Sequence, residues 1–136
     1  MDRLTIQKAT IAFGAVYVLL GILGFVPGIT TDVPDSGSVP LEGELLGIFA
    51  VNLIHNLAHI AVGMVMIWGA SRADRVALTN RGMTAVFALL VVVSVIAPIV
   101  EGVAINPPDT ALHTLSALIV GYLGFFAVRE PALEHS

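Results

Sequence analysis

The chain contains no cysteine, which excludes disulfide bonds, thiolate metal sites and cysteine nucleophiles. Charged residues are also scarce: they make up 12% of 136 residues, whereas soluble domains average about 25%. The net charge is −4, and no basic patch supports nucleic-acid binding. Hydrophobic residues make up 57%, with a mean hydropathy of +0.94. This composition predicts one integral membrane domain over residues 1–136, surrounded by a lipid bilayer and without a nucleic-acid partner.

Four stretches without charged side chains are long enough to cross a bilayer. Each has at least 18 residues, close to the roughly 20 that a membrane-spanning helix needs. Because lipid offers no hydrogen bonds to the backbone, we expect helices over all four. The sequence therefore predicts an all-α, four-helix transmembrane bundle with spans at residues 9–26, 45–70, 83–100 and 110–128.

Charge placement predicts the orientation of the bundle. The connections at residues 27–44 and 101–109 carry only acidic charges, and every basic residue lies on the other side: Arg3, Lys8, Arg72, Arg75, Arg81 and Arg129. By the positive-inside rule, both termini are expected in the cytoplasm and the chain in the cell (inner) membrane. Residues 27–44 are rich in Pro, Gly, Ser and acids, so we expect an irregular loop. Residues 41–51 are expected to begin the second helix early or to lie at the surface.

Polar side chains interrupt the second stretch with helical spacing. Their positions follow i, i+3, i+4, i+7 and i+11, which places them on one helix face. Polar groups in a membrane span normally face the bundle interior. The face consists of Asn52, His55, Asn56, His59 and Gly63.

A faint repeat links the second and fourth stretches. The spacing from His55 to Gly63 recurs from His113 to Gly121, which suggests a parallel repeat of two helix pairs. The repeat predicts that His55 and His113 lie side by side at one depth. It also predicts that the two glycines let the second and fourth helices approach closely. Asp109 is expected to cap the fourth helix.

The polar residues have several interpretations. A network without metal is possible, because a neutral His both donates and accepts; Asn56 or a backbone carbonyl would then satisfy His59. Alternatively, His55, His59 and His113 bind a divalent metal or haem. A proton or small-solute relay and a lipid or quinone contact also remain open. The candidate network or ligand cluster comprises Asn52, His55, Asn56, His59, His113, Glu101 and Asp109.

No enzyme signature accompanies these residues. There is no HExxH motif, no glycine-rich phosphate loop and no Ser-His-Asp order. Small residues on the first predicted helix indicate helix packing, at Gly14, Gly21 and Gly24. We therefore favour a non-enzymatic structural or accessory membrane protein without a cofactor. Its expected partners are other membrane subunits or a second copy of the chain.

Three motifs together resemble a prokaryotic family of four-span membrane proteins known as domain of unknown function 4383. They are Gly24-Phe25-Val26-Pro27-Gly28, Asn52-x-x-His55-Asn56-x-x-His59-x-x-x-Gly63 and Asn106-x-x-Asp109-x-x-Leu112-His113. The resemblance extends from about residue 3 to residue 128. It implies a four-helix membrane fold and indicates no reaction, ligand or partner.

Overall fold

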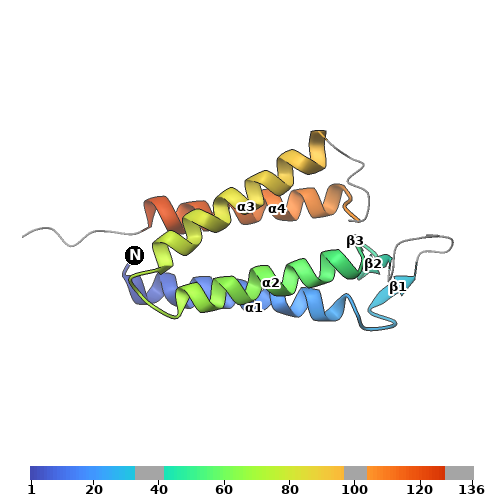
Figure 1. The fold of residues 1–136 in the computed structure, drawn as a ribbon, viewed down its shortest axis with the longest axis horizontal. Helices are drawn as coiled ribbons and strands as arrows, with labels where there is room; N and C mark the ends of the chain where they lie inside the picture. Colours follow the sequence, from blue (N-terminus) through green and yellow to red (C-terminus); the bar gives the residue numbers. More distant parts are fainter. Residues whose placement is uncertain (33–41, 97–103, 128–136) are drawn as a thin grey trace, which may run out of the picture.

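The computed structural model describes residues 1–32, 42–96 and 104–127 of the chain, and its main elements are four long helices (Figure 1). The helices confirm the predicted all-α class, and all four are long and apolar enough to cross a membrane. In chain order the elements are α1 (Arg3–Leu23), β1 (Thr30–Asp32), β2 (Gly43–Leu45), β3 (Phe49–Val51), α2 (Leu53–Ala70), α3 (Val76–Ile96), α4 (Pro107–Gly121) and the π-helical turn η1 (Tyr122–Phe126).

The helices form two antiparallel pairs. In Figure 1, α1 lies along α2 in one layer and α3 lies with α4 in the other, while the far end of α3 leans away from α2. Such pairs are the arrangement that the predicted repeat requires. The two layers meet along an interface, and three histidines, His55 and His59 of α2 and His113 of α4, are buried there.

Glycines bring α1 and α2 together. A Cβ atom added to Gly14 would lie 2.7 Å from the Gly63 carbonyl oxygen, and one added to Gly21 would lie 2.6 Å from the Asn56 carbonyl oxygen. Real Cβ atoms essentially never approach so closely. The small-residue positions of the first helix are therefore packing positions, because any side chain would separate the two helices.

The prediction that Gly63 and Gly121 bring α2 and α4 together is wrong. Gly63 packs against Gly14 and Val18 of α1, whereas a Cβ on Gly121 would meet Thr84 of α3, at an ordinary 3.4 Å. The same spacing occurs in both helices, but each glycine packs against the other helix of its own pair, Gly63 against α1 and Gly121 against α3. Backbone approach between α2 and α4 therefore does not arise from these positions.

The second helix begins later than predicted. Residues 43–51 form the hairpin of β2 and β3, and β1 adds a third antiparallel strand. Leu46 and Gly47 both have positive φ, at 56° and 68°, which a right-handed helix does not allow. Asn52 then caps α2 by accepting a hydrogen bond from the His55 N–H. The expected helix start at residue 45 and the wholly irregular loop are thus both wrong in this part.

The fourth helix is capped by Asn106, not by Asp109 as predicted. Asn106 Oδ1 accepts from the Asp109 N–H at 3.2 Å, and Asp109 Oδ2 accepts from the Asn106 N–H at 3.0 Å. This reciprocal pair is a capping box. The Asn106 amide also donates to the Ile48 carbonyl at 2.8 Å, which ties the start of α4 to the β2–β3 turn.

Apolar packing and several hydrogen bonds hold the end of the bundle opposite the strands. Its buried core consists of Ile6, Ala70, Val76, Leu123 and Ala127. Nearby, the amide of Asn80 on α3 donates to the hydroxyl of Thr10 on α1 at 2.8 Å. Both residues are fully buried, so the two layers are joined here by a satisfied hydrogen bond.

Candidate functional site

Three histidines meet between the two layers of helices. His55 and His59 come from α2 and His113 comes from α4, and their exposed fractions are 3%, 5% and 3%. One ring nitrogen from each lies within 4.8 Å of the other two. The predicted proximity of His55 and His113 is confirmed, with ring centres 6.1 Å apart. The three rings define what we call the histidine cluster.

His55 is held in place from both of its ring nitrogens. Its Nδ1 lies 2.6 Å from the Ala104 carbonyl oxygen, and its Nε2 lies 3.0 Å from His59 Nε2. A carbonyl oxygen only accepts, so His55 Nδ1 carries the hydrogen of this bond. In a neutral imidazole, Nε2 then carries the lone pair and lies next to His59 Nε2.

Several polar atoms in or near the cluster have no hydrogen-bond partner among the described residues. These are His59 Nδ1, His113 Nδ1 and Asp109 Oδ1, all of them buried. Asp109 Oδ1 lies 4.0 Å from His55 Nε2, while the other carboxylate oxygen serves the capping box. Because unpaired buried polar groups are costly, a group that bonds to these atoms would stabilise the site.

The two asparagines of the predicted network lie outside the cluster. Asn52 precedes α2 and acts as its N-cap. The buried amide of Asn56 faces α1, where a Cβ on Gly24 would collide with it. His59 Nε2 contacts His55 Nε2, and Asn56 forms no hydrogen bond with His59. Glu101, the remaining candidate, lies outside the described residues.

Aromatic residues enclose the histidine cluster. Tyr17 of α1 meets the His59 ring edge-on at 5.1 Å, and Phe87 of α3 stacks on His113 at 6.1 Å. The Tyr17 hydroxyl and Ser116 Oγ are 2.7 Å apart. The three histidines, both aromatic rings and apolar side chains line a cavity of about 50 Å³, which is large enough for one small ion or water.

Sequence reasoning missed Tyr17, Phe87 and Ser116 as parts of the site. One signal was present for Ser116, because it lies three residues after His113 and thus on the same face of α4. Tyr17 carried a weaker signal, since it places a hydroxyl inside an uncharged span. Phe87 has no polar atom, and nothing in the sequence distinguished it from other core residues.

Comparison with known proteins yields one match. The family model described as domain of unknown function (DUF4383) matches residues 7–126, which include every residue of the histidine cluster. No curated protein and no solved structure matches the chain.

Proposed function

The chain belongs to the DUF4383 family, and we propose that it is a non-enzymatic membrane protein whose histidine cluster binds one divalent transition-metal ion. The observation that carries the proposal is the convergence of three buried imidazoles, with ring nitrogens within 4.8 Å of one another. In this role the ion links α2, which supplies His55 and His59, to α4, which supplies His113.

The donor set suits zinc. Imidazole nitrogens bind zinc readily, and structural zinc sites have four protein ligands. Asp109 Oδ1, 4.0 Å from His55 Nε2, is the fourth donor of the proposed site. Nitrogens bound to one zinc at roughly 2.0–2.1 Å lie about 3.3 Å apart, so binding requires the imidazoles to draw together by about 1.5 Å at most.

The environment of His55 supports the same proposal. Metal-bound histidines usually donate from the second ring nitrogen to a carbonyl or carboxylate, which fixes the tautomer and the ring orientation. His55 Nδ1 makes this contact with the Ala104 carbonyl oxygen at 2.6 Å. The Nε2 atom is thereby left as a lone-pair donor aimed at His59 and Asp109.

The size of the cavity argues against haem. Cofactor pockets typically enclose about 300–1,000 Å³, whereas the cavity at the histidine cluster has about 50 Å³. A haem between α2 and α4 would displace Tyr17 and Phe87, which pack on the histidines. An ion of atomic size requires no such rearrangement.

A network without metal is the second candidate, and one contact favours it. His55 Nε2 and His59 Nε2 are 3.0 Å apart, a distance at which one nitrogen donates a hydrogen to the other. However, this network leaves His59 Nδ1, His113 Nδ1 and Asp109 Oδ1 unpaired among the described residues. Each such atom costs about 1–3 kcal/mol, so hydrogen bonds alone satisfy the cluster poorly.

A site closed by protein ligands gives the ion a structural role. We propose that the protein acts as a structural or accessory subunit, together with other membrane subunits or a second copy of itself. The segregation of all six Lys and Arg residues supports a position in the cell membrane with both termini in the cytoplasm. The histidine cluster then lies in the outer half of the bilayer.

Metal analysis tests the proposal. The protein is purified in detergent without chelators, and its metal content is measured by mass spectrometry. We expect about one zinc ion per chain, lost after His55→Gln, His59→Gln or His113→Gln and released on acidification, which protonates the imidazoles. His135→Gln is the matched control, because it removes the fourth histidine of the chain, which the proposal does not use.

The glutamine variants also separate the two candidates. An amide still donates and accepts hydrogen bonds but is a poor zinc ligand. If the network holds the helices without metal, the glutamine variants keep most of the thermal stability and zinc does not raise it. That result, together with metal-free wild-type protein, would exclude the metal site.

A further inference from the structure

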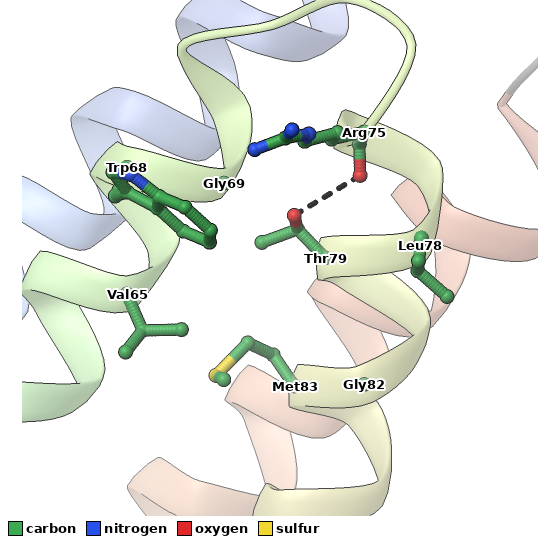
Figure 2. A pocket seen from close by; sticks show the side chains of 8 residues that line it. All are labelled: Val65, Trp68, Gly69, Arg75, Leu78, Thr79, Gly82 and Met83. Atoms are coloured by element: carbon green, nitrogen blue, oxygen red, sulfur yellow. Dashed lines mark hydrogen bonds between the residues drawn. The ribbon is translucent and has the colours of Figure 1, made fainter.

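A second cavity lies between α2 and α3, at the end of the bundle that carries the basic residues. Figure 2 shows it between Val65 and Trp68 of α2 and Leu78, Gly82 and Met83 of α3, with Arg75 at its rim. Its volume is about 460 Å³. We propose that this groove binds one anionic phospholipid, with an acyl chain between the helices and the phosphate at Arg75.

The shape of the groove follows from two glycines. At Gly69 the helices touch, because a Cβ there would collide with the Thr79 side chain. Farther along, α3 leans away from α2 (Figure 1), and a Cβ on Gly82 would meet no atom of the described residues within 4 Å. The space that opens between the helices is therefore not filled by any of the described residues.

The walls of the groove have the chemistry of a lipid contact. Val65, Leu78 and Met83 present aliphatic and thioether groups, and Leu78 is 72% exposed. A span helix exposes such side chains to acyl chains and not to water. The volume of the groove falls within the range of about 300–1,000 Å³ that ligand sites occupy. An acyl chain fits these walls in both size and polarity.

The rim of the groove supplies a positive charge at headgroup level. The Arg75 guanidinium lies 5.3 Å from the centre of the Trp68 ring, and Trp and Arg side chains together are typical of the membrane interface. Among the described residues, Arg72 forms an ion pair with Asp74 at 3.2 Å, whereas Arg75 forms none. A guanidinium binds phosphate oxygens through paired hydrogen bonds.

The charge at the rim of the groove favours an anionic lipid over a neutral one. Arg75 forms no ion pair among the described residues and places a positive charge beside an apolar groove, and a lipid with a net negative headgroup complements both features. In the proposed orientation this end of the bundle is cytoplasmic, the leaflet where anionic headgroups attract basic residues near the membrane. The proposal does not depend on the metal site, since the groove and the histidine cluster share no residue.

Native mass spectrometry of the detergent-solubilised full chain tests the proposal, with phosphatidylglycerol and phosphatidylcholine as probes. We expect the wild type to retain one phosphatidylglycerol per chain in preference to phosphatidylcholine. Arg75→Gln should weaken phosphatidylglycerol binding about tenfold, because it removes charge-assisted hydrogen bonds. Arg72→Gln is the matched control, since it removes the same charge from a residue that does not line the groove.

The volume of the groove is tested at Gly82. Gly82→Leu places a side chain in the open space and should abolish retention of the lipid, whereas Gly82→Ala should leave it nearly unchanged. Equal thermal stability of the two variants would show that the leucine has not disrupted the fold. Equal losses from Arg75→Gln and Arg72→Gln would overturn the proposal, because they would indicate attraction to the general surface charge. Unchanged lipid retention with loss of a dimer in Gly82→Leu would also overturn it, since the groove would then hold a second copy.

Discussion

Two glycines in membrane-spanning helices should respond oppositely to the same substitution. Gly63→Ala adds a methyl group where α2 crosses α1, while Gly82→Ala adds one on α3 where no atom of residues 1–32, 42–96 or 104–127 lies within 4 Å. Both glycines lie inside helices, so alanine improves helix propensity at both, by about 0.5–1 kcal/mol. Only Gly63→Ala also creates a clash.

The size of the clash follows from the neighbours of Gly63. Its new Cβ would lie 2.7 Å from both Val18 Cγ2 and Val18 N, whereas ordinary contacts span 3.4–4 Å. The α1 and α2 backbones would have to separate by roughly 1 Å, and overpacking of this kind costs about 1–3 kcal/mol. Because the propensity gain is common to both variants, Gly63→Ala should be less stable than Gly82→Ala by about 1–3 kcal/mol.

The comparison is made by unfolding both variants and the wild type in mixed micelles of a mild detergent and dodecyl sulfate, followed by far-ultraviolet circular dichroism. We expect Gly82→Ala to be at least as stable as the wild type and Gly63→Ala to unfold at a lower fraction of dodecyl sulfate. Equal stability of the two alanine variants would refute the argument, since it would mean that α1 and α2 do not cross at Gly63.

Two further predictions concern the hydrogen bond between Tyr17 and Ser116 and the orientation of the chain in the membrane. Tyr17→Phe removes the buried hydrogen bond to Ser116 and should lower the free energy of unfolding by about 0.5–1.5 kcal/mol. Tyr122→Phe is the control, because Tyr122 is 55% exposed and its substitution should change the free energy of unfolding little. Equal effects of the two substitutions on thermal unfolding would contradict this reasoning. In intact cells, an impermeant thiol reagent should label Ser36→Cys and not Ser71→Cys, because the basic residues flank Ser71; the reverse labelling would invert the orientation.

Much of the fold could be predicted because the bilayer restricts the alternatives. Long uncharged stretches have few structures open to them in lipid other than helices, and the four helices follow from that constraint. The proximity of His55 and His113 was predictable for a related reason. An imidazole facing lipid is costly, so histidines on two helices turn inward, and their similar depth then brings them together.

The helix ends were only partly predictable, because they depend on competition between local hydrogen bonds. Asn52 is a good N-cap by type, but its spacing to His55 fits both an N-cap and a position on the polar face of α2, so the spacing does not distinguish the two roles. Asn106 and Asp109 are both capable caps, and their reciprocal bonds decide which one precedes α4. The three-residue strands before α2 are too short for a periodic pattern to identify.

The sequence by itself determined the membrane class, the four helices and the inward direction of the histidines, because each follows from the cost of exposing charge or backbone to lipid. Only the tertiary structure decided which surfaces meet. It placed Gly63 against α1, set Tyr17 and Phe87 around the histidine cluster, and opened the groove beside Gly82. The reason is that apolar faces carry little directional information, so side-chain shape selects the neighbour of each helix only when all four helices are packed together.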